Sequence, residues 1–115
     1  MNREIKDLFT NFIVDGVNIP VAFMNYKGNQ ETYITYTQTH SDTTFSTDDE
    51  LRNYIVYYDF DIFSKGNYLN IIEELKNKLI SDGWTWQPTM DSADMYEPDT
   101  KYYHKTVCMS HIKEA

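Results

Sequence analysis

The chain has 115 residues, of which 41% are hydrophobic and 16% aromatic, and its 18 acidic and 10 basic residues give a formal net charge of −8. This length favours one domain over residues 1–115, and the aromatic content is atypical of a disordered chain. Because no cluster of Lys or Arg offsets the acidic charge, we expect no direct nucleic-acid binding and no attraction to anionic membranes.

The first element predicted is an amphipathic helix at residues 3–14. Apolar residues recur there at the spacing of one helix face, and polar residues fill the opposite face. The apolar positions are Ile5, Leu8, Phe9, Phe12 and Ile13. Asp15 and Gly16 are typical of a helix end, so we expect the helix to stop before them.

Two short strands are predicted next, at residues 21–24 and 32–38. The second alternates, with Ile34 and Tyr36 on one face and Tyr33, Thr35 and Thr37 on the other. A turn signal at residues 27–29 separates the two strands. We therefore expect them to pair as a hairpin.

Residues 38–49, with the sequence QTHSDTTFSTDD, predict a long polar loop. It holds a single apolar side chain, Phe45, which is too little to offset the entropy of ordering the segment. We expect the loop to be mobile in the free chain and to become ordered on a partner. Phe45 would anchor it there, while Asp48 and Asp49 meet basic groups. A tolerated surface insertion is the alternative.

The longest strand is predicted at residues 51–63. Its apolar face has period two, and its other face mixes aromatic and acidic side chains. The apolar face holds Tyr54, Val56, Tyr58, Phe60 and Ile62, and the mixed face includes Tyr57, Asp59, Asp61 and Phe63. A turn at residues 64–67 then leads to a second helix with a core stripe of Tyr68, Ile71, Ile72, Leu75 and Leu79. Gly83 suits the position just after its end.

The last third of the chain predicts two more strands. Residues 84–88 open one strand with both tryptophans on the same side, residues 91–100 read as an acidic loop, and residues 102–111 alternate as a strand. The predicted order is α-β-β-β-α-β-β. The fold class is α+β, with two helices packed on one face of a mostly antiparallel four- to five-stranded sheet.

Asp59 and Asp61 are the first candidates for chemistry. They share a strand face and lie roughly 7 Å apart along the chain. Paired carboxylates can bind a divalent cation or divide acid–base work, but both uses need further converging groups, and the sequence has no motif that supplies them. A solvated or intersubunit strand face is the favoured interpretation.

The other reactive residue types form no recognisable motif either. His104 and His111 are seven residues apart on one strand and should point to opposite faces, so they predict no zinc pair. The lone Cys108 is expected to be a small buried residue and not a nucleophile. No clustered glycines predict a phosphate loop. We expect no catalytic residues, no metal and no cofactor, and hence no enzyme.

An ordered series of segments resembles a known family. The series comprises residues 19–23 (IPVAF), 57–68 (YYDFDIFSKGNY) with the helix that follows, 83–88 (GWTWQP), 94–97 (DMYE) and 102–106 (YYHKT). It is similar to the tail-terminator and tail-to-head joining proteins of siphophages that infect Gram-positive bacteria. The likeness spans roughly residues 19–107, and its weight comes from the order of the segments, since no single motif is diagnostic.

The resemblance implies a structural virion protein and no catalytic residues. Such a subunit forms a ring, commonly a hexamer, that caps the tail tube and provides the head–tail junction. Its partners would be copies of itself, the tail tube protein and a head-completion or connector protein. It would be located in the host cytoplasm during assembly and then in the virion. The alternatives are a neighbouring connector or stopper protein, or a soluble acidic inhibitor of the DNA-mimic type.

The residues themselves indicate which surfaces a ring would use. Closed rings need a heterologous interface, in which one surface of a subunit meets a different surface of the next. Aromatic side chains mixed with charge are typical of interfaces. The candidate subunit or partner interface is therefore Phe45, Asp48, Asp49, Tyr57, Asp59, Asp61 and Phe63.

Overall fold

The computed structural model describes residues 2–43 and 53–114, which form two α-helices, a short 3-10 helix and eight strands. In chain order they are α1 (Asn2–Leu8), β1 (Ile13–Val14), β2 (Val17–Asn18), β3 (Val21–Phe23), β4 (Tyr33–Thr43), β5 (Asn53–Ser64), α2 (Tyr68–Ser81), β6 (Thr85–Trp86), η1 (Pro88–Met90), β7 (Met95–Glu97) and β8 (Tyr102–Glu114). The predicted α+β class is confirmed. The predicted element order is wrong, because short strands were missed at both ends of the chain.

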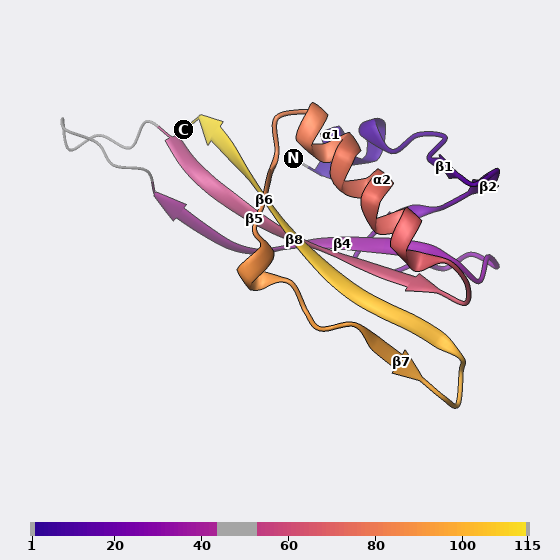
Figure 1. Cartoon of the computed structure of the whole chain (residues 1–115). Coiled ribbons are helices and arrows are strands. Elements are labelled where there is room, and N and C mark those ends of the chain that lie inside the picture. Colours follow the sequence, from indigo (N-terminus) through magenta and orange to yellow (C-terminus); the bar gives the residue numbers. More distant parts are fainter. Residues whose placement is uncertain (1, 44–52, 115) are drawn as a thin grey trace.

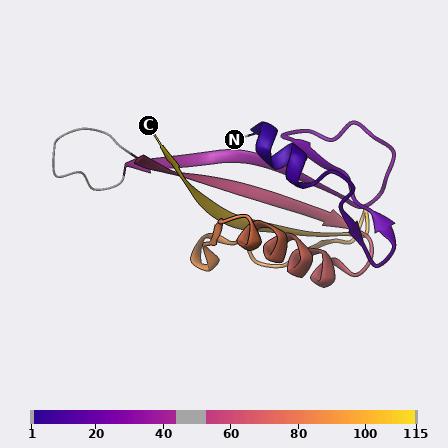
Figure 2. The ribbon, with the colours of Figure 1, turned by 90° about the horizontal axis from the view of Figure 1, so that it is seen from above.

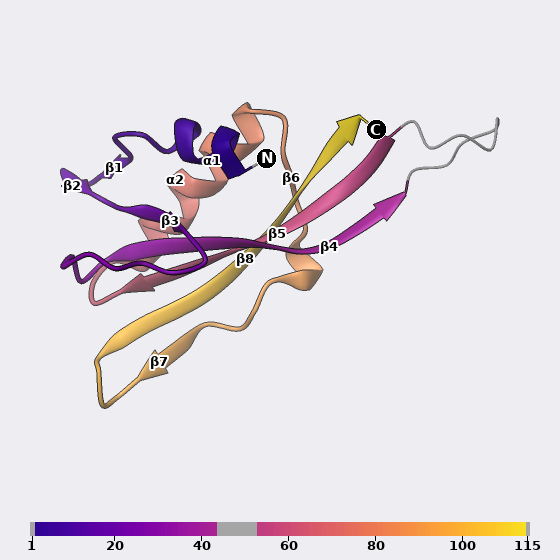
Figure 3. The same ribbon diagram turned by 180° about the vertical axis from the view of Figure 1, so that it is seen from behind.

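Six of the strands form one mixed, mostly antiparallel sheet, one strand more than the largest number predicted. Its order is β3-β4-β5-β8-β6, and β7 also pairs with β8. Long β5 lies in the middle, antiparallel to both β4 and β8. Both α-helices lie above this sheet in Figure 1 and in the reverse view of Figure 3. The prediction that the helices pack on one face is therefore confirmed.

The core forms between the helices and the inner face of β5. Val56, Tyr58, Phe60 and Ile62 alternate along the strand and are all buried, as the period of two predicts. Seen from above, α1 lies toward the β4 side of this face and α2 toward the β8 side (Figure 2). The buried stripe of α2 is the predicted one, namely Ile71, Ile72, Leu75 and Leu79, with Tyr68 partly buried beside it.

Gly83 ends α2 and redirects the chain onto the sheet. Its φ of +94° lies in the left-handed region, which glycine adopts without a steric penalty. The N–H of Gly83 donates to the carbonyl of Ile80 at 3.1 Å, and that of Trp84 donates to the carbonyl of Leu79 at 3.0 Å. These two bonds satisfy carbonyls that the helix end leaves free. They also bury the Trp84 ring against Phe60, with 6.0 Å between ring centroids.

The first helix is shorter than predicted, because α1 ends at Leu8 and not at residue 14. The chain turns at Asn11, which has a φ of 58°, and the Phe12 ring folds back onto Phe9 at 5.1 Å. Both rings are buried, as a longer helix would also have buried them, so the hydrophobic pattern alone could not detect the turn. Ile13, expected in the stripe, is 59% exposed on β1.

Asp15 and Gly16 form a hairpin turn and do not cap a helix. Both have positive φ, of 53° and 79°, and they join β1 to β2, which are antiparallel. Asp-Gly is a favoured pair for such two-residue turns. The Asp15 carboxylate accepts a hydrogen bond of 3.0 Å from the amide of Asn70 on α2, which ties the hairpin to that helix.

The predicted hairpin of residues 21–24 and 32–38 is also wrong, because β3 and β4 are parallel. Val21 is aligned with Ile34 and Phe23 with Tyr36. Residues 24–32 carry the chain back to the end of the sheet where β3 begins, and Met24 starts this return with a φ of 62°. Sequence alternation fixes the faces of a strand but not the direction of its neighbour.

The polar segment predicted as a loop is partly strand. β4 continues to Thr43, with a register shift between Gln38 and His40, and its pairing with β5 extends to Thr43 and Tyr54. These residues are held by backbone pairing and not by burial of apolar side chains, so their polar composition gave no strand signal. The rest of that prediction, including Phe45, Asp48 and Asp49, lies outside the described residues.

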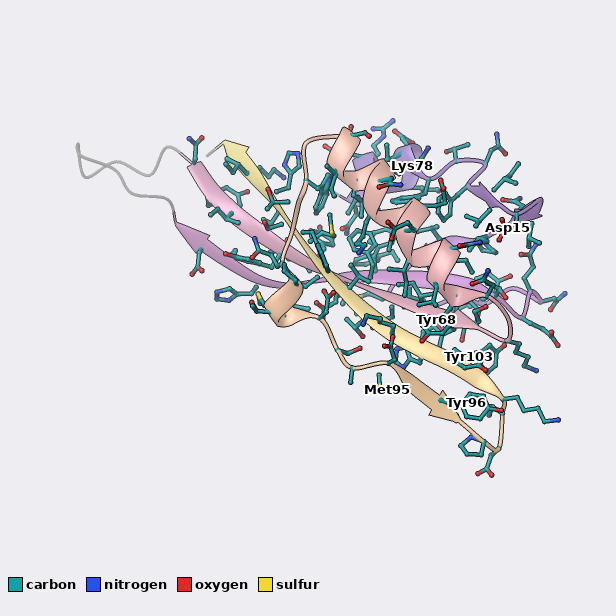
Figure 4. The ribbon with its side chains drawn as sticks, viewed as in Figure 1. Asp15, Tyr68, Lys78, Met95, Tyr96 and Tyr103 are labelled. Atoms are coloured by element: carbon teal, nitrogen blue, oxygen red, sulfur yellow. The ribbon has the colours of Figure 1, made fainter. Side chains whose placement is uncertain are left out.

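The acidic segment at residues 91–100 contains β7, which pairs with β8 and projects as a hairpin at the lower right of Figure 1. Tyr68, Tyr103 and Tyr96 lie in a row from α2 across β8 to β7 (Figure 4), with centroid separations of 5.1 and 4.9 Å. Neither α-helix in the described ranges has the length and apolar character needed to cross a bilayer.

Candidate functional site

The face of the main sheet opposite α1 and α2 contains the predicted interface residues of β5. Tyr57, Asp59, Asp61 and Phe63 all point to this side and are half-buried, in alternation with the buried core residues. We call this surface the open face. Its other members follow from the strand register and are Tyr33, Thr35, Thr37 and Asp42 of β4 and Tyr102, His104, Thr106, Cys108 and Ser110 of β8.

Charge is sorted between the two faces of the sheet. The register places Asp42, Asp59 and Asp61 on the open face. It places Lys105 and Lys113 of β8 on the helix side, opposite Ile62 and Tyr54. Within the described parts of β4, β5 and β8, the open face therefore has aspartates and no lysine or arginine. From the turn after β5, the Lys65 ammonium lies 5.1 Å from the centroid of the Tyr102 ring at one end of this face. Net charge alone could not reveal this separation.

The two central aspartates differ in their surroundings. Asp61 accepts a hydrogen bond from the Thr106 hydroxyl, and its Oδ1 lies 3.5 Å from His104 Nε2. That nitrogen is buried and has no hydrogen-bond partner among the described residues, so the pair is a close approach and not a hydrogen bond. Burial raises the pKa of the Asp59 carboxyl, and the neighbouring Asp61 charge raises it further.

An aromatic stack covers one end of the open face. Tyr26 stacks on Tyr33 at 4.7 Å, Tyr33 on Phe63 at 4.9 Å, and Phe63 on His104 at 4.2 Å. Tyr102 meets the Phe63 ring edge-on. Sequence reasoning identified only Phe63 of this group. The alternation of β4 had placed Tyr33 on the correct face, but only the pairing of strands brings the rings together.

Cys108 lies at the centre of the open face but is fully buried, with 0% of its surface exposed. Burial raises the pKa of its thiol to about 11, and the nearby charges of Asp59 and Asp91 add to this effect. Its backbone N–H donates to Asp91 Oδ1 at 2.8 Å, so Asp91 and neighbouring residues cover this part of the sheet. The predicted buried position of Cys108 is confirmed. A buried neutral thiol is a poor nucleophile.

We therefore expect Cys108 to resist thiol reagents in the folded protein. At pH 8 a pKa of about 11 leaves about one thiol in a thousand ionised, before burial slows the reaction further. Titration with a chromogenic disulfide should label almost no thiol in native buffer and one thiol per chain in denaturant. Labelling at the rate of a free small thiol in native buffer would contradict this account.

The histidines do not converge. His104 stacks on Phe63 on the open face, whereas His111 contacts Trp84 on the helix side at 5.0 Å, so the predicted opposite orientation is confirmed. Among the described residues, no group of three His, Cys, Asp or Glu side chains is close enough to hold a metal ion.

A surface hollow lies elsewhere, between α1 and the end of α2. It has a volume of about 550 Å³, and its lining includes Leu8, Phe12, Ile13 and Lys78. It contains neither a histidine nor a cysteine. Its polar lining consists of Asn11, Glu74, Asn77, Lys78, Ser81 and Asp82.

Comparison with known proteins adds no relative from which a function could be carried over. The sequence matches no protein-family model, and it matches no curated protein. Function therefore has to be inferred from the arrangement of side chains on the open face and from the resemblance in the ordered residue series.

Proposed function

We propose that the protein is a tail terminator of a siphophage, a structural subunit whose ring caps the tail tube and forms the head–tail junction. The observation that carries this proposal is the open face, a broad sheet surface that neither α1 nor α2 covers. A sheet normally buries an apolar face against another layer. Here that face combines an aromatic stack with aspartates that have no lysine or arginine partner among the described residues, a composition that suits contact with other proteins.

The ordered residue series supports the same assignment. Its segments supply central elements of the fold, namely β3, β5 with the start of α2, β6, β7 and the beginning of β8. A ring-forming subunit needs neither a cofactor nor a catalytic group. The partners in this proposal are copies of the chain, the tail tube protein and a head-completion protein. Phe45, Asp48 and Asp49 remain proposed contacts with these partners.

The net charge of −8 is compatible with a ring through which DNA passes, because an acidic surface repels phosphates. On the open face, the described residues of β4, β5 and β8 include no lysine or arginine that would bind phosphate. A DNA-mimic inhibitor would instead need carboxylates spaced like phosphates over a wide surface. The centre of this face has two, Asp59 and Asp61, and aromatic rings occupy its end.

The proposal predicts that the purified protein assembles into closed rings when it is concentrated or mixed with purified tails. A heterologous interface closes into a ring when its rotation divides a full turn without a rise along the axis, and it gives an open filament otherwise. Native mass spectrometry and negative-stain microscopy would detect one discrete oligomer, expected to be a hexamer. Open-ended filaments would refute closure, and a strict monomer even on tails would refute the ring.

Gene order separates this function from that of a neighbouring connector. A terminator gene should lie just before the gene of the major tail protein. Sequencing the genome region around the gene therefore offers an inexpensive first test. A location remote from any tail gene would count against the whole proposal.

A further inference from the structure

The outer edge of β4 is open over the second half of the strand. On that side β3 pairs only with residues 34–36 of β4. There the Tyr36 carbonyl accepts a hydrogen bond of 2.9 Å from the Met24 N–H, so its backbone groups are directed outward. By the alternation of a strand, Gln38 directs its N–H and C=O to the same side. No described strand pairs with this side of residues 38–43, which we call the β4 edge.

The outer edge of β8, on the far side of the sheet, is sealed along most of its length. β7 and β6 each pair with part of it. Between them, Thr106 exchanges two hydrogen bonds with Ser92, of 2.8 and 3.0 Å, and the Cys108 N–H donates to Asp91 Oδ1 at 2.8 Å. These groups take the place of a paired strand. Beyond β6, residues 111–114 of β8 have no outer strand in the described chain, and we call them the β8 edge.

The β4 edge has few of the features that protect exposed strand edges. Proteins commonly protect such edges with lysine, proline or a bulge. Residues 38–43 contain neither lysine nor proline, and the Asp42 carboxylate lies 3.2 Å from His40 Nε2. The register shift between Gln38 and His40 leaves the rest of the segment paired with β5. An edge of this kind binds an extended strand through main-chain hydrogen bonds.

The two open edges have the relative direction that a ring requires. β4 and β8 are both antiparallel to β5, so they are parallel to each other. They lie on opposite sides of β5 and extend beyond both helices at the same end of the sheet (Figure 1). A rotation about an axis along the strands keeps the strand direction and therefore places one edge beside the other as a parallel pair. Two β4 edges, in contrast, would pair across a twofold axis and give a closed dimer.

We infer that the β4 edge binds the β8 edge of a second copy of the chain, so that the sheet continues from one subunit into the next. This inference rests on the proposed ring function and names the two surfaces of its interface. One chain cannot join its own two edges, because β5 lies between them. Each subunit would use the β4 edge toward one neighbour and the β8 edge toward the other, which is a heterologous contact.

Single cysteines test this arrangement directly. One protein carries Asp42→Cys and a second carries Ile112→Cys, at positions that are both exposed. Both residues are in register with Ile55 of β5, so their side chains lie on the same face of the sheet. Asn77→Cys, on the exposed side of α2, is the matched control. A short bis-maleimide is added at neutral pH to each protein alone and to each pairwise mixture, with purified tails present.

We expect a crosslinked dimer in the mixture of Asp42→Cys and Ile112→Cys, and none in either protein alone or in mixtures with Asn77→Cys. The wild type measures any background from Cys108, which is buried. Efficient crosslinking of Asp42→Cys with itself would overturn the inference in favour of a twofold dimer. Wild-type rings without a crosslink in the mixture would overturn the inference but leave the ring function standing. A wild type that never associates, even on tails, would remove both.

Proline at the β4 edge supplies an independent readout. Gln38→Pro removes the outward N–H and sets a bulky ring against the incoming strand. It should raise the protein concentration needed for half-maximal ring formation at least about tenfold. Gln38→Ala is the matched control, because it removes an exposed side chain and keeps the N–H, and it should leave that concentration unchanged.

Both Gln38 variants should keep the wild-type melting curve, since the bonds between β4 and β5 remain. If the proline lowers that curve, the comparison moves to Ile112→Pro against Ile112→Val on the β8 edge, where the side chain is 61% exposed. Equal effects of the proline and its control, or no effect of the proline, would contradict the proposed pairing.

Discussion

Phe60→Asp is expected to abolish folding, and with it all soluble protein. Phe60 lies at the middle of the central strand, with 0% of its surface exposed. Its ring packs on Phe9 from α1, on Tyr36 from β4 and on Trp84 after α2. A carboxylate there would be buried without a partner, which costs several kcal/mol, and the aromatic contacts would be lost as well. The whole domain is stabilised by roughly 5–15 kcal/mol.

The matched control is Tyr57→Asp on the same strand, because Tyr57 points to the open face and is half-buried. That protein should remain soluble and show a cooperative thermal transition. Val56→Asp, at a position as buried as Phe60, should fail in the same way as Phe60→Asp. Expression yield and circular dichroism melting would check all three. A normal transition for either core variant would mean that the assignment of the two faces of β5 is inverted.

The elements that were predicted correctly from the sequence each bury one side, and this burial gives their apolar residues a regular spacing. The alternation of β5 and the stripe of α2 were correct, since both elements bury one side against the same core. Gly83 was correct because a left-handed residue after a helix favours glycine for local steric reasons. In each case the physical cause acts within a few residues, so the local sequence contains the information.

The errors arose where a distant partner decides the structure. Residues 38–43 are polar and joined β4 only because β5 offers a backbone edge to them. The direction of β3 depends on the path of residues 24–32 and not on its own composition. Phe9 and Phe12 are buried whether or not a helix connects them, which hid the early end of α1.

The same distinction between local and distant causes applies to the residues of the candidate site. The four β5 residues of the predicted interface share a face because they are spaced by two, which sequence reveals. The stack of Tyr33, Phe63 and His104 requires the pairing of β4, β5 and β8, which sequence does not reveal.

The second large effect follows from the proposed terminator function and concerns the length of phage tails. A terminator ring stops tube growth by covering the end to which the next tube ring would add. Without it, tube protein continues to polymerise and no surface remains for the filled head. Removing the gene from its phage should therefore abolish infectious particles. Supplying the wild-type protein from a plasmid should restore them, while Phe60→Asp supplied in the same way should not.

Tail length in the lysate of that deletion tests the central claim most directly. Electron microscopy should show tails of irregular and excessive length beside separate filled heads, and added purified protein should return the tails to a single length. A neighbouring connector would give a different result, namely tails of normal length that are merely unjoined. Tails of normal length attached to heads in the absence of the protein would contradict the proposed function.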